Sequence, residues 1–148
     1  MSYIICALLI IIDQAIKFLS VSKLKPLGSV EIIKGILSFT YVENKGAAFG
    51  ILQNARWVFI LATIIIIAAL IIYKIKFKVN SKIYNYSSIL LISGGIANLI
   101  DRIFSGYVVD MIEVTFIDYP VFNFADCCVV VGAILMCIYV LKMDSKKG

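Results

Sequence analysis

Four long apolar runs divide the chain, and each is near the ~17–25 residues that an α-helix needs to cross a bilayer. They cover residues 3–19, 57–73, 83–100 and 124–141. The second and third runs contain no charged residue, whereas Asp13 and Lys17 interrupt the first and Asp126 lies near the start of the fourth. The pattern predicts four transmembrane helices. An even number of crossings places both termini on the same side of the membrane.

The segments between the runs predict additional structure on one side of the membrane, in residues 20–56 and 101–123. Residues 29–42 are rich in Val, Ile, Phe, Thr and Tyr, and Gly35 interrupts them, which predicts two short strands. Residues 47–54 are expected to form a short helix on the membrane surface. The expected fold class is an all-α membrane protein, a four-helix bundle with a small extracytoplasmic β-sheet and a short surface helix. All of it belongs to one domain, residues 1–148.

The lysines predict which side faces the cytoplasm. Dense clusters occupy two short segments, Lys74, Lys76, Lys78 and Lys82 after the second run, and Lys142, Lys146 and Lys147 after the fourth. The basic residues of the opposite side are spread over the longer segment 20–56 and are accompanied by Glu31 and Glu43. Since cytoplasmic loops are enriched in lysine and arginine, we expect both termini in the cytoplasm.

Composition supports the membrane interpretation. Of the 148 residues, 62% are apolar, and the mean hydropathy is +1.03, whereas soluble domains are about 45–50% apolar. The net charge of +5 does not indicate a nucleic-acid partner, because the lysines flank apolar runs and form no basic stripe interleaved with aromatic residues.

The sequence contains no histidine, and its four cysteines lie inside apolar stretches without C-x-x-C spacing. The lack of histidine excludes Ser–His and Cys–His nucleophile systems and argues against zinc. A carboxylate site for a hard cation stays open on this reasoning. We expect no metal and no cofactor.

Polar residues on separate segments fall at one depth, near the extracytoplasmic boundary of the predicted bundle. An ionisable group inside a span costs at least ~2.5–3.5 kcal/mol on insertion scales, so a group of them predicts an organised site. Two simpler interpretations remain for single residues: Asp101 with Arg102 as a structural ion pair, and Asp126 as a helix cap. The residues at this depth are Asp13, Lys17, Asn44, Asn98, Asp101, Arg102, Asp110, Asn123 and Asp126.

Without histidine, the natural catalytic arrangement for such a site is a pair of carboxylates. Two carboxylates held close together share a proton near neutrality, so that one can activate water while the other binds the scissile carbonyl. Spacing does not choose between the candidates, which are Asp101, Asp110, Glu113, Asp118 and Asp126.

Five sequence blocks resemble the bacterial lipoprotein signal peptidases (signal peptidase II) over nearly the whole chain. The blocks are Asp13-Gln14 with Lys17, residues 44–50 (NKGAAFG), 94–102 (GGIANLIDR), 106–112 (GYVVDMI) and 122–126 (FNFAD). The resemblance implies that Asp110 and Asp126 form the catalytic dyad of an aspartic endopeptidase. It implies supporting or substrate-binding roles for Asp13, Lys17, Asn44, Gly46, Asn98, Asp101, Arg102 and Asn123. Our hypothesis is that Lys17 and Arg102 pair with carboxylates, while the asparagines orient the dyad or the substrate.

The resemblance also implies a substrate and a location. The family removes the signal peptide from prolipoproteins by cleaving before a cysteine that carries diacylglycerol. The expected location is the bacterial cytoplasmic membrane, with the site on the extracytoplasmic side, membrane lipid as a partner and the chain as a monomer. Only fifteen residues, 111–125, separate Asp110 from Asp126, which is short for this loop.

Two other functions are consistent with intramembrane acids. A proton-coupled transporter would place titratable groups at the midplane and continue them to the inner side, where this chain has only lysines. A non-enzymatic membrane assembly factor would tolerate the loss of Asp110 or Asp126 individually, whereas a catalytic dyad would not.

Overall fold

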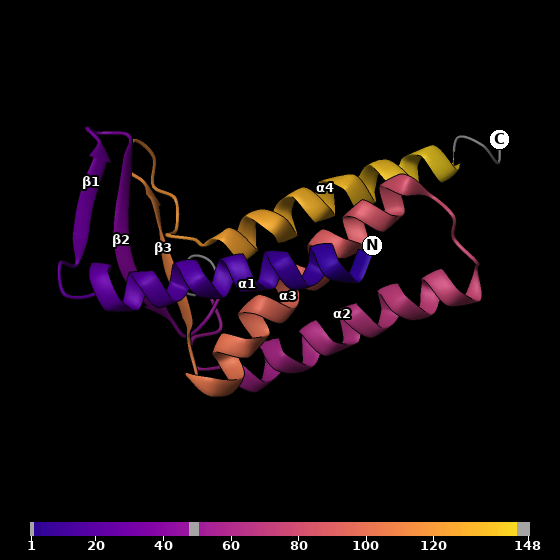
Figure 1. Ribbon diagram of the computed structural model, residues 1–148, viewed down its shortest axis with the longest axis horizontal. Helices are drawn as coiled ribbons and strands as arrows, with labels where there is room; N and C mark the ends of the chain where they lie inside the picture. The colour runs from indigo at the N-terminus through magenta and orange to yellow at the C-terminus, as the bar shows by residue number, and fades with distance from the viewer. Residues whose placement is uncertain (1, 48–50, 145–148) are drawn as a thin grey trace.

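Four helices form an elongated bundle in the computed structural model, which describes residues 2–47 and 51–144. They run lengthwise through the molecule, as Figure 1 shows, and each is long and apolar enough to cross a membrane. The four predicted spans are therefore confirmed, with ends that extend by up to four residues. The helices are α1 (Ser2–Leu19), α2 (Arg56–Lys76), α3 (Lys82–Phe104) and α4 (Phe124–Asp144).

Helix α3 is the centre of the bundle, because it packs against each of the other three helices and most extensively against α4. Its best membrane-spanning window has a mean hydropathy of 1.3, against 2.2 to 2.8 for the other three. A helix that faces protein rather than lipid can have small and polar residues on its packed sides. The buried residues of α3 include Ser87, Ser93, Gly94 and Ala97.

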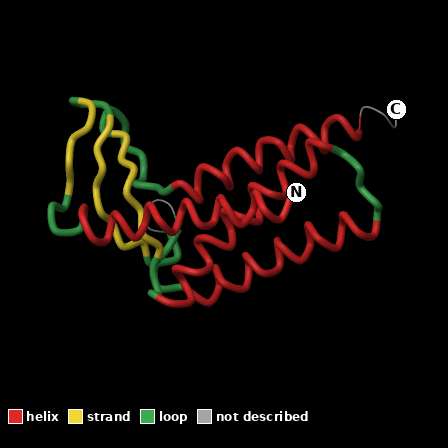
Figure 2. Tube along the Cα trace, in the orientation of Figure 1, coloured by secondary structure: helices red, strands yellow, loops and turns green. Residues whose placement is uncertain are grey.

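A three-stranded antiparallel sheet lies at one end of the bundle (Figure 2). Its order is β1-β2-β3, with β1 at Ser29–Ile33, β2 at Leu37–Asn44 and β3 at Val108–Val114. The two strands predicted on either side of Gly35 are confirmed as β1 and β2, and Gly35 itself has a φ of +67° in the turn. Strand β3 was not predicted. It pairs with β2 so that Asp110 lies opposite Val42.

The sheet is anchored to the first helix. A short π-helix, η1 (Ser20–Leu24), continues α1 toward the sheet. Its buried Leu24 forms a small apolar core with Val109 and Met111 of β3. Because successive residues of a strand point to opposite faces, the neighbouring Asp110 is directed to the other face of β3. The anchoring of one face therefore positions the carboxylate on the other.

The predicted surface helix at residues 47–54 falls partly on residues 48–50, which lie outside the described residues. Residues 51–54 form turns rather than a helix. Leu52 and Asn54 have positive φ values of 55° and 64°. Such a backbone is incompatible with a continuous right-handed helix.

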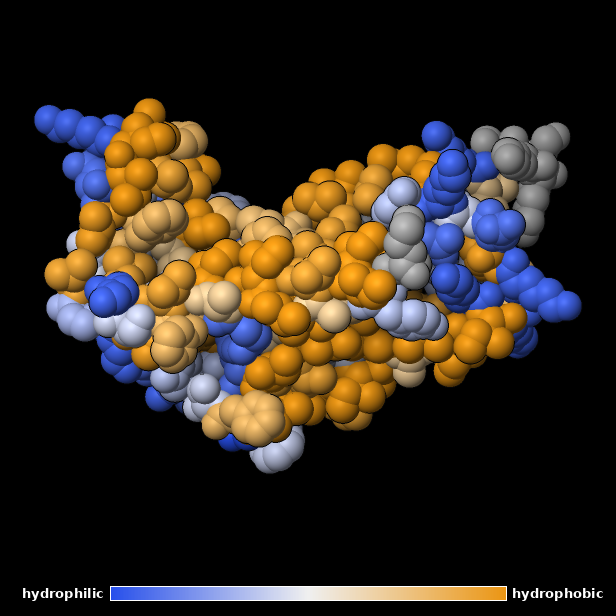
Figure 3. All heavy atoms as spheres, in the orientation of Figure 1, coloured by the Kyte–Doolittle hydropathy of each residue, from blue (hydrophilic) through white to orange (hydrophobic). Residues whose placement is uncertain are grey.

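The surface of the molecule is apolar along the helices and strongly hydrophilic at one end. In Figure 3 apolar side chains cover the flanks of the helices and extend onto the sheet, while hydrophilic residues gather at the end opposite the sheet and along the outer edge of the sheet. Exposed apolar side chains of α2 include Leu61, Ile65 and Ile72. A contiguous apolar surface of this kind is typical of a protein that contacts lipid.

Candidate active site

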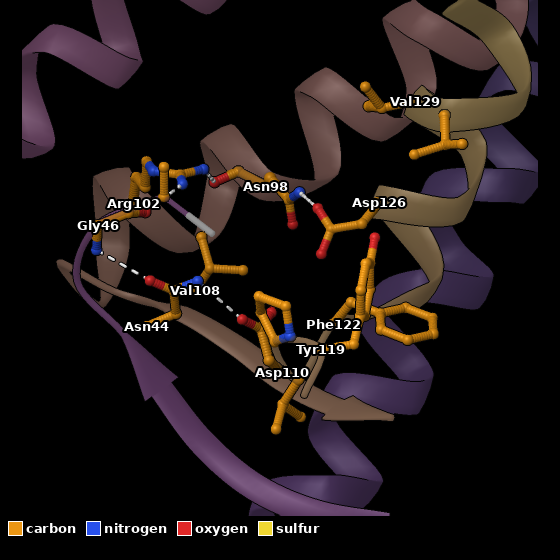
Figure 4. Close-up of a pocket in the computed structure, with 14 residues that line it drawn as sticks. Asn44, Gly46, Asn98, Arg102, Val108, Asp110, Tyr119, Phe122, Asp126 and Val129 are labelled. Carbon is orange, nitrogen blue, oxygen red and sulfur yellow. Dashed lines mark hydrogen bonds between the residues drawn. The ribbon is translucent and has the colours of Figure 1, made fainter. Parts of the chain in front are cut away.

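Two carboxylates from different elements line one cavity at the sheet end of the bundle. Asp110 is in the middle of β3, and Asp126 is in the first turn of α4. Figure 4 shows both side chains at this cavity. The cavity has a volume of about 290 Å³, and its walls also come from α3, β2 and the segment that leads into α4. Of the five acids that spacing left open, these two line the cavity.

The other three acids do not line this cavity. Asp101 is buried and forms an ion pair with Lys17. Glu113 accepts a hydrogen bond from the Thr40 hydroxyl, and Asp118 is exposed in a turn.

Asparagine and backbone N–H groups donate to all four oxygens of the two carboxylates. The Asn123 and Asn44 side-chain amides donate to Asp110 Oδ1 and Oδ2, over 2.7 and 2.9 Å. The Asn98 side-chain amide donates to Asp126 Oδ1 over 2.8 Å, and the Asn123 backbone N–H donates to Asp126 Oδ2 over 3.1 Å. Because these donors come from β2, α3 and the residue just before α4, the position of each carboxylate is fixed by several parts of the fold at once.

Lys17 determines how Asn98 is oriented. Its ammonium group is buried and donates to Asn98 Oδ1 over 2.7 Å. Asn123 Nδ2 donates to the same oxygen over 3.2 Å. Since that oxygen is held by two donors, the amide nitrogen of Asn98 must face the other way, toward Asp126. Lys17 thus acts on Asp126 through Asn98.

The same ammonium group joins two buried acids. Lys17 Nζ lies 2.9 Å from Asp13 Oδ2 and 2.8 Å from Asp101 Oδ2. Asp13 Oδ1 accepts a hydrogen bond of 2.8 Å from the Ala125 N–H in the first turn of α4. Acids near a helix N-terminus satisfy unpaired N–H groups there. The expected pairing of Lys17 with carboxylates is present, and it connects α1 to α3 and to α4.

Arg102 is placed differently from our hypothesis of a carboxylate pair. Its guanidinium donates to the carbonyl oxygens of Gly46 and Asn98, over 3.2 and 3.4 Å, and lies 4.8 Å from the Phe59 ring centroid. No ion pair of Arg102 occurs within residues 2–47 and 51–144. The guanidinium lines the cavity, so its positive charge faces the space beside the two acids.

Asn44 and Gly46 form a compact turn at the edge of the cavity. Asn44 Oδ1 accepts a hydrogen bond of 2.9 Å from the Gly46 N–H, which directs the Asn44 amide nitrogen toward Asp110. A Cβ atom at Gly46 would lie 2.7 Å from the Ile51 carbonyl oxygen. Glycine is therefore required for the close approach of the chain at this point.

The electrostatic environment favours a proton on the pair. The pKa of Asp110 is raised to about 6, chiefly by burial and also by the nearby negative charge of Asp126, while the hydrogen bonds from Asn44 and Asn123 and the charge of Lys17 oppose the rise. A carboxyl group whose pKa approaches neutrality can exchange protons during a reaction at physiological pH. Together, the two carboxyls can take a proton from water and deliver one to a substrate.

Other residues of the cavity were not identified from the sequence. Tyr119, Pro120, Val121 and Phe122 come from the short segment before α4, and Val108, Val129 and Val130 add apolar walls. For residues 119–122, the position between Asp110 and Asp126 in the chain was the available signal. Gln14 was also missed as a supporting residue, although it donates to Asp101 Oδ1 over 3.0 Å.

Comparison with known proteins yields one consistent family. The family model described as Signal peptidase (SPase) II matches residues 5–142. A lipoprotein signal peptidase of Clostridium acetobutylicum is 41% identical over 99% of this chain and 97% of its own length. One from Caldanaerobacter subterraneus subsp. tengcongensis is 46% identical over 92% of each chain. A solved structure described as a bacterial membrane enzyme superposes with a TM-score of 0.90 at 36% identity, covering 99% of this chain and 91% of that one.

Proposed function

The chain belongs to the signal peptidase II family, the lipoprotein signal peptidases of bacterial membranes, and from that premise we propose that Asp110 and Asp126 are its catalytic dyad. The observation on which the proposal rests is the shared cavity, where two acids from β3 and α4 meet with all four of their oxygens hydrogen-bonded. Asp13, Lys17 and Asp101 then serve as positioning residues.

The reaction is hydrolysis by an activated water molecule. The ionised carboxylate of the dyad takes a proton from water as the water oxygen attacks the scissile carbonyl carbon, and the protonated carboxyl donates its proton to the carbonyl oxygen. As the resulting tetrahedral diol collapses, the carbon–nitrogen bond breaks, the leaving nitrogen receives a proton from one carboxyl of the dyad, and a diol hydroxyl gives its proton to the other carboxylate. The products are a carboxylic acid and an amine, which become a carboxylate and an ammonium by proton transfer between them, and one proton is again shared by the pair.

The proposed substrate is a prolipoprotein that is cut immediately before its diacylglyceryl-modified cysteine. The dyad is carried by β3 and the first turn of α4, at the sheet end of the bundle, where the apolar helices begin or end. At such a boundary the acyl chains can remain in lipid while the peptide bond reaches water. The lysine-rich end of the molecule faces the cytoplasm in this proposal, and the sheet is extracytoplasmic.

The test is cleavage of a diacylglyceryl-modified prolipoprotein by the detergent-purified chain. Asp110→Asn and Asp126→Asn are expected to be folded and inactive, with activity reduced by roughly 10³-fold or more, since each removes one of two groups that act as a unit. Asp118→Asn is the matched control, because Asp118 is exposed and outside the cavity. Near-wild-type activity in either dyad variant would remove that residue from the mechanism. A folded wild-type chain that cuts nothing would overturn the proposed substrate.

A further inference from the structure

A second cleft lies at the end of the bundle opposite the sheet. It has a volume of about 540 Å³ and is lined by residues of α1, α2, α3 and the turn after α2. Helix α3 packs against both α1 and α2, whereas α1 and α2 share little contact with each other, which leaves the cleft between them. The cleft shares no lining residue with the cavity of Asp110 and Asp126.

The walls of the cleft are apolar and its margin is cationic. Leu70, Ile71 and Ile92 are among the apolar lining residues. Lys74, in the last turn of α2, and Lys78, just after that helix, line the same cleft. Within the described part of the chain neither lysine forms an ion pair. An occupant with a long apolar part and an anionic group would match both features.

Two buried polar atoms that line the cleft make no hydrogen bond of ordinary geometry with any described residue. They are Asn85 Oδ1 and Ser88 Oγ. Only 7% of Ser88 is exposed. Buried polar groups are nearly always satisfied, so an unpaired pair beside a cleft indicates that the occupant supplies polar atoms. A glycerophospholipid offers ester carbonyls to the serine hydroxyl, and a glycerol headgroup offers hydroxyls to the asparagine oxygen.

We propose that this cleft binds an anionic glycerophospholipid, with its phosphate between Lys74 and Lys78 and an acyl chain along the apolar wall. The transmembrane segment of a substrate would be a poorer match to the positive charges of Lys74 and Lys78. In the orientation proposed above, the positively charged start of a signal peptide would lie at this end of the bundle and would be repelled by the same lysines. The lipid would fill the space between α1 and α2 and connect two helices that otherwise meet only through α3.

The experiment is native mass spectrometry of the full detergent-purified chain with phosphatidylglycerol or phosphatidylcholine that have identical acyl chains. The wild-type chain is expected to retain one phosphatidylglycerol in preference to phosphatidylcholine. The double variant Lys74→Gln/Lys78→Gln is expected to lose roughly 10- to 30-fold in affinity for the anionic lipid, from about 1 kcal/mol per basic residue. The charge-matched control Lys76→Gln/Lys82→Gln, which changes residues outside the cleft, should behave as the wild type does.

A second measurement uses only the wild-type chain, so it does not depend on whether the variants fold. Phosphatidylglycerol with a photoreactive acyl chain should crosslink to cleft residues such as Cys6, Ile71 and Ile92. Equal binding of both lipids, loss of affinity in the control pair as well, or crosslinks spread evenly over the lipid-facing helices would each overturn the proposal. A dimer that excludes the lipid would overturn it too.

Discussion

At the scale of a single side chain, burial and hydrogen bonding have opposite effects on the pKa of Asp110. Only 1% of the residue is exposed, and this burial disfavours its ionised form. The amides of Asn44 and Asn123 favour the ionised form, because they donate to its two oxygens. Burial prevails, and the pKa rises to about 6 from an ordinary value of 3.8. The folded protein therefore becomes less stable when Asp110 ionises.

The first prediction concerns stability against pH. Below about pH 3, Asp110 is protonated in both the folded and the unfolded chain, and it has no effect. As the pH rises from about 3 to about 6 the unfolded chain ionises first, so the free energy of unfolding falls by about 3 kcal/mol at most. Asp110→Asn should lack this fall when unfolding in detergent is measured at about pH 3 and about pH 7. Asp118→Asn should keep it; an identical fall in Asp110→Asn would show that Asp110 is not the destabilised group.

The second prediction concerns the pH dependence of cleavage. Asn44→Ala removes a hydrogen bond that lowers the pKa of Asp110, so the pKa rises further. Since the two acids titrate as a pair, the whole bell-shaped profile of kcat/KM should move to higher pH. Asn80→Ala, an exposed change in the turn between α2 and α3, should leave it in place. A profile that only drops in height, without moving, would mean that Asn44 binds substrate rather than tuning the acid.

At the residue scale, the sequence predicted which polar residues lie close together, but it did not predict every ion-pair or hydrogen-bond partner among them. The i, i+4 spacing of Asp13 and Lys17 was enough to predict their ion pair, since both lie on one helix face. Asp110 and Asp126 were chosen from the family resemblance. Their carboxylates are brought to one cavity by the relative placement of β3 and α4, which local sequence does not reveal. The partners of Arg102 were predicted wrongly for the same reason. Its carbonyl acceptor on Gly46 is 56 residues away in the chain.

At the scale of elements, the contact between α3 and α4 sets the distance between their functional side chains. Gly94 lies one turn before Asn98 on α3 and faces α4. A Cβ atom at Gly94 would lie 2.5 Å from the Ala125 carbonyl oxygen and 2.8 Å from Val129 Cγ2. Any side chain there would separate the two helices where Asn98 reaches Asp126.

The third prediction uses two adjacent glycines. Gly94→Ala should destabilise the protein by roughly 1–3 kcal/mol and lower kcat, because the helices must move apart. Gly95→Ala is the matched control. Its Cβ atom would meet the Thr63 side-chain methyl at 3.3 Å, a contact that a small shift relieves. Thermal unfolding and cleavage kinetics of both variants test this, and equal effects would show that the spacing of α3 and α4 does not limit the reaction.

Elements that depend on local sequence were predicted, whereas the strand that depends on long-range pairing was not. The four spans and the β1–β2 hairpin depend on local hydrophobic pattern and on the turn at Gly35, and these were predicted. Strand β3 pairs with β2 across more than sixty residues, for example Leu37 with Val114, and was missed. Its run of Val108, Val109, Met111 and Ile112 is typical of a strand. This local pattern was the available signal, but it does not indicate that the segment pairs with β2.

At the scale of the whole molecule, charge and apolar surface define an axis across the membrane. The helices begin or end at two opposite faces, with the sheet and both acids at one and the turn after α2 with its lysines at the other. The apolar flank between these ends matches the requirement for lipid contact (Figure 3).

The fourth prediction tests this axis in living bacteria. Green fluorescent protein fused after Gly148 should fluoresce, because it folds in the cytoplasm. Alkaline phosphatase inserted after Lys34, in the turn between β1 and β2, should be active, because it requires the oxidising extracytoplasmic side. The reversed pair of results would invert the proposed orientation and place the dyad in the cytoplasm.

The bond from the Ala125 N–H to Asp13 also has a consequence for biosynthesis. The two residues are 112 positions apart. At a translation rate of ~5–20 residues per second, Ala125 is therefore synthesised roughly 6–20 s after Asp13. During that interval Asp13 can already pair with Lys17 inside its own helix, which lowers the penalty of leaving both charges in the membrane. The nascent chain therefore has no assembled centre until its last helix is translated, and a ribosome that stalls before that point releases a fragment in which the Asp13–Ala125 bond cannot form.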